Sequence, residues 1–439
     1  MITEKQKNLA DWALKFALKN GCSDARITAY SGMDNSFEYR NNQLDKLEQS
    51  SESGMSFYLF VDGRFSYFST NRLEKKELER FILHNIESTR CLEKDEFRRL
   101  PDPDRLFRGK AGDLELFDTN ILEISVDEKL ELLRNSVNEV YQTDDRLIAV
   151  SAAYSDGTDE SFMIDSNGFE GESATTYFNL SAETSLKDKG HSRPSAHWYD
   201  VSIFWDQLQK KGIARKAYER TLNRLGQEKI RSGKYKMLVD NRNITRLLSP
   251  IIAALYGSSI QQKNSFLIDK LDEKIISEKI TIIDNPHLKR ARGAGWFDGE
   301  GVATKKMNVI EKGILKTYYI NTYFAGKLKM MPTIQSPSVL LMDSGNKNRE
   351  ELLNTVEKGI WVTGFNGGNT NSSTGDFSLG IEGFLIKNGK VTIPVNEMNI
   401  TGNLLSLWQN VNEVGNDPLL ISSWRIPSVL FDDVCFNGK

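Results

Sequence analysis

The sequence predicts an α+β fold, with an N-terminal half of strands and helices and a mostly antiparallel, mainly-β C-terminal domain. Long helical periods are few after residue 260. At 439 residues the chain exceeds one typical core, so we expect an N-terminal α+β domain at 1–100, a middle α+β segment at 113–226 packing with it, and a mainly-β domain at 230–439. Dipeptides that favour hairpin turns recur along the chain: Asp62-Gly63, Asn167-Gly168, Lys312-Gly313 and Asn388-Gly389.

The first region is expected to hold two helices around a group of strands. Thr3 and Gln6 have the spacing of a capping box, and an apolar helical period follows them. The patterns after it predict strands at 25–30, 36–40 and 55–69, then a helix at 73–89.

A Pro- and Asp-rich stretch at 101–104 and glycines at 109 and 112 mark a linker to the middle segment. Ser125 and Glu128 form a second capping-box pattern, which predicts a helix running to about residue 141. Strands turned at Asp156-Gly157 and Asn167-Gly168 should follow, and then a helix at 205–225.

The C-terminal domain should begin with a strand at 235–239 and a helical stretch at 243–257. Pro250 must either start a new helix there or kink a continuous one. Strands are expected at 280–283, 302–310 and 314–320. In the stretch 361–403, apolar runs are separated by Gly and Asn, and the polar residues 366–373 predict a loop between strands.

Composition limits the function classes. The formal net charge is −3 and the pI about 6.0, so the totals lack the basic character typical of a nucleic-acid-binding protein. Three scattered cysteines indicate a reducing compartment, and no apolar run approaches 18 residues. We expect a cytoplasmic protein with no membrane span and no nucleic-acid partner.

Few residues suggest chemistry by themselves. No phosphate-binding loop, dinucleotide fingerprint, Gly-x-Ser-x-Gly or His-Glu-x-x-His pattern occurs. His191 and His197 bracket a Ser-Arg-Pro loop and could bind a metal, although a solvated loop is the more ordinary interpretation. Asp298 and Glu300 could form an acid/base pair, or their charges could cap a glycine-rich turn.

Several motifs occur in an order that resembles the TldD/PmbA family, from about residue 20 to the end of the sequence. They are Asn167-Gly168-Phe169, the glycine-rich run 295–301, Gly367-Gly368, Thr374-Gly375-Asp376-Phe377-Ser378, Asn388-Gly389-Lys390 and Val414-Gly415-Asn416-Asp417. Each motif is weak alone, and their shared order and spacing carry the resemblance.

The resemblance implies a metallopeptidase context. Catalytic TldD-type subunits carry His-Glu-x-x-x-His on a helix, with a distant cysteine, around one zinc. The corresponding helix here, 243–262, has no His, Glu, Asp or Cys, and the segment after Asp417 has no cysteine until Cys435. These departures match the PmbA/TldE branch. They imply a cytoplasmic subunit with no metal and no catalytic residue of its own. It would act with a zinc-holding TldD-type partner on unfolded or extended peptides. A non-catalytic subunit needs a large partner-facing surface, and exposed apolar area of that kind rarely stays free, so we expect at least a homodimer when the chain is alone.

Candidate residues for substrate binding or for the subunit interface are those of the polar stretch, where an extended peptide could lie along a strand edge. They are Gly367, Gly368, Thr374, Gly375, Asp376 and Phe377. A purely structural loop is the alternative. Two other functions stay open: a non-enzymatic binding or regulatory protein, as the older name of DNA gyrase modulator suggests, and an independent peptidase with a relocated site, which the residue inventory disfavours.

Overall fold

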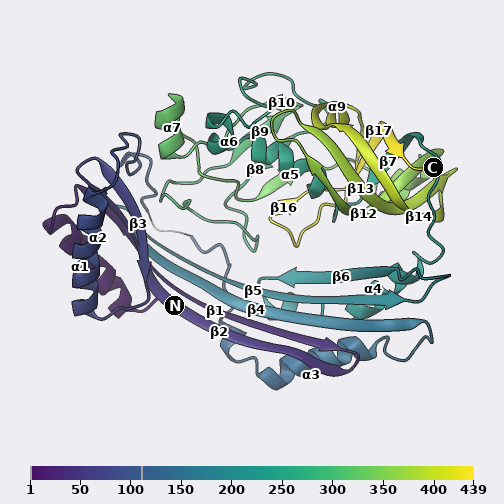
Figure 1. The fold of residues 1–439 in the computed structure, drawn as a ribbon, viewed down its shortest axis with the longest axis horizontal. Helices are drawn as coiled ribbons and strands as arrows, with labels where there is room; N and C mark the ends of the chain where they lie inside the picture. The colour runs from purple at the N-terminus through teal and green to yellow at the C-terminus, as the bar shows by residue number, and fades with distance from the viewer. Residues whose placement is uncertain (1, 110–111) are drawn as a thin grey trace.

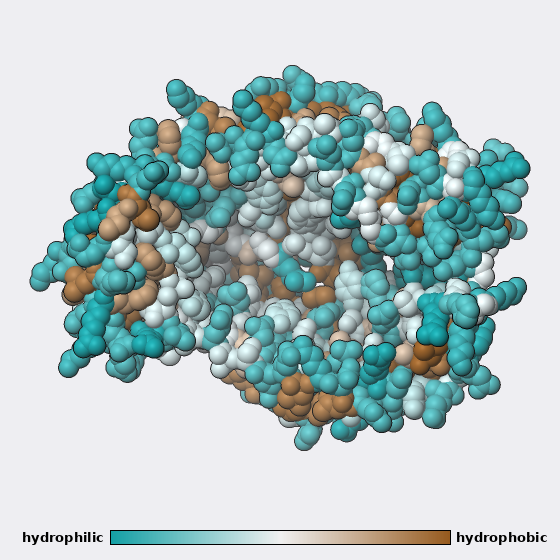
Figure 2. Space-filling model, viewed as in Figure 1, coloured by the Kyte–Doolittle hydropathy of each residue, from teal (hydrophilic) through white to brown (hydrophobic). Residues whose placement is uncertain are grey.

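The computed structural model describes residues 2–109 and 112–439. An N-terminal half built on a long curved sheet faces a C-terminal half across a hollow (Figures 1 and 2). Helices and abundant strands confirm the predicted α+β class. Among the described residues, no helix is long and apolar enough to cross a membrane.

The N-terminal half is organised by one antiparallel six-stranded sheet. Its first and middle regions share this sheet, because β1 pairs with both β2 and β4. The strand order is β3-β2-β1-β4-β5-β6. The strands are β1 (Asp24–Arg40), β2 (Gln43–Val61), β3 (Arg64–Thr70), β4 (Leu147–Asp165), β5 (Glu170–Leu186) and β6 (Ser195–Ser202).

Helices cover one face of this sheet. Alternate residues such as Ile27 and Phe37 are fully buried beneath them, as the period of two in a strand requires. Helices α1 and α2 pack at one end of the sheet, and α3 and α4 pack at the other (Figure 1). The opposite face carries mainly polar residues and is turned toward the C-terminal half. The helices are α1 (Glu4–Lys19), α2 (Lys75–Arg90), α3 (Val126–Asn138) and α4 (Ile213–Leu222), with a 3-10 turn, η1 (Thr119–Leu122), before α3.

The capping signals predict the first helix and α3 correctly. Thr3 with Gln6, and Ser125 with Glu128, make reciprocal capping boxes. The helix expected at 205–225 is shorter than predicted. A 3-10 turn, η2 (Trp205–Gln207), comes first, and α4 begins only after Gly212, whose φ of +79° is outside the helical region.

The turn predicted at Asp156-Gly157 is wrong, because both residues lie inside β4. Asp156 is fully buried, and its carboxylate accepts hydrogen bonds from Lys129 Nζ at 2.6 Å and from Asn35 Nδ2 at 2.6 Å. A Cβ on Gly157 would clash with the Met33 carbonyl of the neighbouring strand. The dipeptide therefore serves a close strand contact and a buried ion pair. In the same way, the two strands expected at 25–30 and 36–40 are one strand, β1.

The C-terminal half contains two further sheets. One has the order β10-β9-β8-β11-β16. The other has the order β14-β13-β12-β7-β17-β15, and β14 also pairs with β17, so five of its strands form a closed barrel. Among the described residues, only the β7–β12 and β11–β16 pairs are parallel. The strands are β7 (Gly233–Val239), β8 (Ile282–Asp284), β9 (Met307–Glu311), β10 (Ile314–Leu315), β11 (Leu340–Met342), β12 (Lys358–Thr370), β13 (Asp376–Lys387), β14 (Lys390–Asn403), β15 (Val411–Val414), β16 (Trp424–Arg425) and β17 (Val429–Asn437).

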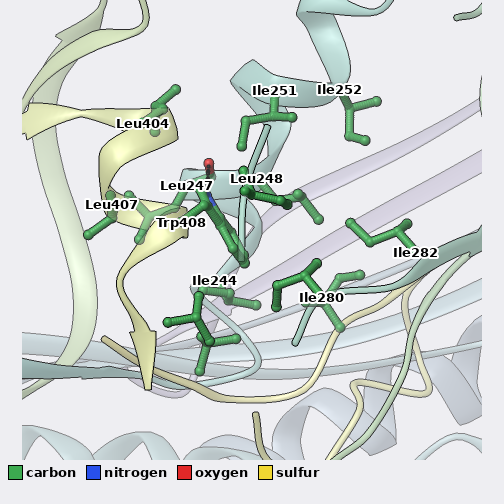
Figure 3. Packing of buried hydrophobic residues seen from close by; sticks show 14 of the residues in the cluster. Ile244, Leu247, Leu248, Ile251, Ile252, Ile280, Ile282, Leu404, Leu407 and Trp408 are labelled. Carbon is green, nitrogen blue, oxygen red and sulfur yellow. Dashed lines mark hydrogen bonds between the residues drawn. The ribbon is translucent and has the colours of Figure 1, made fainter. Parts of the chain in front are cut away.

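Helix α5 (Thr245–Ala254) lies at the centre of the C-terminal core and continues through Pro250. Its apolar side chains pack with Trp408, which is fully buried and donates its Nε1 hydrogen to the Leu247 carbonyl at 3.1 Å (Figure 3). The remaining helices are α6 (Gly257–Gln261), α7 (Thr322–Leu328), α8 (Arg349–Asn354) and α9 (Leu404–Gln409).

Candidate functional site

Two adjoining cavities lie on the helix-free face of the six-stranded sheet, in the hollow that Figure 2 shows between the halves. The larger has a volume of about 910 Å³ and the smaller about 550 Å³. Both are lined by Leu116, Asp159 and Thr175, so they form one cleft.

The pleat of the sheet decides which side chains reach the cleft. Thr28, Tyr30 and Asp34 alternate along β1 with residues that face the helices, and they line the two cavities. Residues opposite these on the neighbouring strand also line the cleft: Ser161 of β4, for example, lies opposite Tyr30. The floor therefore offers hydroxyls, phenols and carboxylates. Its other lining residues from the sheet include Ser56, Tyr58, Tyr67, Thr158, Ser173 and Tyr177.

The opposite wall comes from residues 112–119 and 290–299. Trp296 and Phe297 line the larger cavity. The Trp296 indole donates a hydrogen bond to the Gly112 carbonyl at 2.7 Å, and the His287 ring lies 4.2 Å from the Trp296 ring, centroid to centroid. Trp296 is thus held by contacts from both halves of the chain, through Gly112 and His287.

Arg26 joins the floor to this wall. It is 4% exposed, and its guanidinium donates to the Glu300 carbonyl at 2.6 Å and to the Gly299 carbonyl at 3.3 Å. Its Nη2 also contacts the Asp165 carboxylate at 3.4 Å. A charged side chain that bridges sheet and loop in this way fixes the width of the cleft.

Acidic groups outnumber basic groups around the cleft. Arg26, Arg290 and Arg292 are the cations that line it. A concave surface lined mainly by one sign of charge concentrates the field of that sign, so the cleft attracts cationic rather than anionic ligands. The carboxylates are Asp34, Glu52, Asp113, Glu115, Asp159, Glu172 and Asp298.

The structure places Asp298 and Glu300 close together but commits both to the turn that carries them. Asp298 accepts backbone hydrogen bonds from Glu300 at 2.9 Å, Val302 at 3.0 Å and Gln335 at 2.9 Å. Glu300 accepts both the backbone N–H and the hydroxyl of Thr322, at 2.9 Å each, at the start of α7. Burial raises the pKa of both carboxyls. These bonds suit turn and helix capping.

The predicted polar loop is shorter than expected, because β12 continues to Thr370. Gly367 and Gly368 lie in this strand beside a register shift, with φ of +92° and +88°. Asp376 accepts from Thr374 Oγ1 at 2.7 Å and Asn403 Nδ2 at 3.0 Å, and those bonds, that of Asn403 first, lower its pKa.

Phe377 is 5% exposed in the barrel core, and Gly375, with φ of +78°, closes the turn before it. None of Gly367, Gly368, Thr374, Gly375, Asp376 and Phe377 lines either cavity. Of the predicted site residues, the cleft contains only Asp298. Sequence reasoning missed Tyr30, Tyr58, Asp159 and Trp296, although the glycine-rich run 295–301 was a recognised motif.

A stretch of β12 has no second strand neighbour in the part of the chain that the structure describes. It pairs with β13 as far as Thr370 but with β7 only as far as Val362. Side chains approach the uncovered carbonyls: Asn243 Nδ2 donates to the Thr363 carbonyl at 2.9 Å, and Arg246 Nη2 to the Gly368 carbonyl at 3.1 Å. The stretch 363–370 is therefore a strand edge contacted by α5 and the turn before it.

The residues present do not form the zinc site that the sequence resemblance would place on the helix after β7. Helix α5 offers no ligand side chain, and its buried face is aliphatic. His191 lies in the turn between β5 and β6, whereas His197, expected in the same loop, is on β6, with its ring centroid 6.3 Å from that of Tyr199. Within the described part of the chain, no group of three His, Cys, Asp or Glu side chains is placed to hold a metal ion.

Comparison with known proteins gives three consecutive family matches. Residues 29–87 match domain 1 of the PmbA/TldA metallopeptidases, residues 119–225 match their central domain, and residues 232–438 match their C-terminal domain. A metalloprotease PmbA homolog of Buchnera aphidicola is 29% identical and covers 92% of this chain and 91% of its own.

Solved structures agree. A protein of Bacteroides thetaiotaomicron, described as a candidate modulator of DNA gyrase, is 53% identical over the whole of both chains, with a TM-score of 0.98. TldE from Thermococcus kodakarensis, at 20% identity, shares the fold with a TM-score of 0.86 over 98% of this chain and 100% of its own. The chain belongs to the PmbA/TldD family.

Proposed function

We propose that this chain is the metal-free subunit of a two-subunit metallopeptidase, and that it provides one wall of the chamber in which an extended polypeptide is held. A TldD-type partner would hold the zinc. The observation that carries the proposal is the mismatch between a family of metallopeptidases and a helix, α5, that has no ligand side chain.

Helix α5 is committed to packing. Its inward face buries Leu247, Leu248 and Ile251 completely. Among its less buried positions are Arg246, Ser249 and Ala253, and none of these residue types is a zinc ligand. A catalytic zinc needs three protein ligands and an open position, so no hydrolytic step is assigned to this chain.

The cleft supports a polypeptide ligand. An extended peptide advances about 3.3 Å per residue, and a cavity of about 910 Å³ continuing into one of 550 Å³ can hold a short extended segment but not a folded domain. Hydroxyls and phenols along the floor can bond a peptide backbone, and Trp296 and Phe297 can contact apolar side chains.

The test combines this chain with a TldD-type relative from the same genome. Peptide cleavage should require both proteins and should stop when a chelator is added. Metal analysis should find zinc in the partner and no stoichiometric zinc in this chain alone. One tightly bound zinc per isolated chain, with activity lost in His191→Ala or His197→Ala, would overturn the proposal.

A protein that acts on DNA gyrase is the second candidate, because the 53% identical relative is described that way. The acidic cleft would then favour contact with a basic protein surface rather than with DNA. Purified chain that alters the supercoiling rate of gyrase, while no TldD-type partner gains activity from it, would favour this candidate.

A further inference from the structure

Strand β2 extends well beyond the strand that covers its outer edge. β3 pairs only with Met55–Val61 of β2, whereas β2 begins at Gln43. The outer edge of residues 43–54 has no strand neighbour among the described residues, and residues 43–53 are all exposed. Such an edge presents unpaired backbone N–H and C=O groups that another strand can bind.

The apolar face of the sheet continues onto this uncovered stretch. Leu47 lies opposite Phe37, and Leu44 opposite Tyr39, in the β1–β2 register. Phe37 and Tyr39 belong to the core cluster beneath α3 and α4, yet Leu44 and Leu47 are 45% and 47% exposed. The leucines thus extend a buried layer that ends abruptly at the edge.

The charges on the other face of the same stretch restrict how a second strand could pair. In an antiparallel pair of identical strands, the residues on either side of the two-fold axis lie opposite each other. If the two-fold axis passes through Asp45, Lys46, Glu48 or Ser50, like charges lie opposite each other. An axis through Leu47 instead places Lys46 opposite Glu48, and an axis through Gln49 places Lys46 opposite Glu52.

We infer that the free edge of β2 pairs antiparallel with the same edge of a second copy of this chain, so that Lys46 lies opposite a glutamate of that copy. The two sheets would become one, and Leu47 would gain a cross-strand neighbour on the side that is now open. The β1–β2 register shifts next to Glu38, which leaves Asp45 without a partner on β1. The strand is therefore regular from Lys46 onward, which favours an axis through Gln49, because the paired residues then lie mostly beyond the irregularity. An axis through Leu47 would instead place the two Leu47 side chains opposite each other. This inference does not depend on the peptidase proposal.

The first test reverses one charge and measures the dimer dissociation constant of the full chain by analytical ultracentrifugation. Lys46→Glu should weaken the dimer about ten-fold or more, because it places two like-charge pairs in the interface. Lys390→Glu, at an exposed position on β14, is the matched control and should leave the constant unchanged. The Lys46–Glu48 contact within one chain, 2.8 Å between mostly exposed groups, contributes little to folding.

The second test restores complementarity. Lys46→Glu combined with Glu48→Lys should recover the dimer if the axis passes through Leu47, and Lys46→Glu combined with Glu52→Lys should recover it if the axis passes through Gln49. Recovery also excludes misfolding as the cause of the loss, because the single variant and both double variants carry the same glutamate at position 46, opposite Glu38 of their own β1. A wild-type chain that stays monomeric at about 100 μM, equal constants for Lys46→Glu and Lys390→Glu, or failure of both double variants would overturn the inference. So would a chain that uses this edge only with a TldD-type partner.

Discussion

The two halves of the molecule differ in how the edges and faces of their sheets are covered. The N-terminal sheet covers one face with helices and leaves the other face, and part of the β2 edge, open. In the C-terminal half, β14–β17 pairing closes a barrel whose buried side chains share one hydrophobic core with α5 and Trp408. Binding surfaces thus lie mainly on the open sheet, and rigidity lies in the closed barrel. Four measurements test this contrast, in order of decreasing expected effect.

The largest effect is expected in the barrel core. Trp408→Ala should lower the free energy of unfolding of the C-terminal half by about 4 kcal/mol, because it removes a fully buried ring and leaves a cavity. Tyr67→Ala, at a residue 55% exposed in the N-terminal half, should change stability by less than about 0.5 kcal/mol. Urea unfolding followed by fluorescence tests both, and similar losses in the two variants would contradict the contrast.

A comparably sensitive position in the N-terminal half is Lys129, on α3. Lys129→Met should cost about 3 kcal/mol, because it leaves the buried Asp156 carboxylate without its cation. Lys15→Met, whose partner Asp11 lies on the exposed surface of α1, should cost almost nothing. Thermal unfolding of both variants decides the matter. Equal melting temperatures would show that Asp156 does not depend on Lys129.

Acid should affect the C-terminal half through Asp284. Burial raises the pKa of this fully buried carboxyl to about 6, against an ordinary value of 3.8. The folded state then holds the proton more tightly than the unfolded state, so the stability from this group is complete below pH 4 and is lost as pH rises toward 6. The loss should be about 2 to 3 kcal/mol. Asp284→Asn should flatten the stability profile in that window. A wild-type profile that rises from pH 4 to pH 6 would contradict this.

The smallest expected effect tests whether the binding site is the cleft or the loop around Asp376 that the sequence predicted. With a TldD-type partner present, Asp159→Asn should lower kcat/KM for a lysine-rich peptide about five-fold, because Asp159 lines both cavities. Asp376→Asn, at a residue that lines neither, should leave it near the wild-type value. Gly368→Ala is a poor probe, since a Cβ there would clash with the Ser378 carbonyl at a positive φ. A larger effect from Asp376→Asn would move the site to the loop.

Local signals were sufficient for much of the fold. Asn388-Gly389 turns β13 into β14 with positive φ at both residues, and Thr3 caps α1 as its spacing predicts. Asp156-Gly157 misled because the same residue types serve a buried ion pair and a close strand contact. A local pattern does not distinguish these two uses of an Asp-Gly pair.

The cleft was less predictable, because it is assembled from segments far apart in the chain. Tyr30, Asp159 and Trp296 meet only after β1 pairs with β4 and Arg26 bonds the 299–300 carbonyls. Nothing local to any of the three marks it as a lining residue. The residues that were predicted, around Asp376, carry conspicuous turn chemistry, and the structure uses that chemistry to close a hairpin.

Closure of the barrel has a consequence for how the chain is made. Val239 of β7 pairs with Val429 of β17, about 190 residues later, so the barrel stays incomplete until nearly all of this sequence has left the ribosome. The six-stranded sheet needs no strand beyond β6 and no covering helix beyond α4, so a chain emerging from its N-terminus can fold it first. During the interval, β7 and β12 are hydrophobic strands with an unpaired edge. The order of synthesis therefore makes the rigid half of the protein the more aggregation-prone one while it is being made.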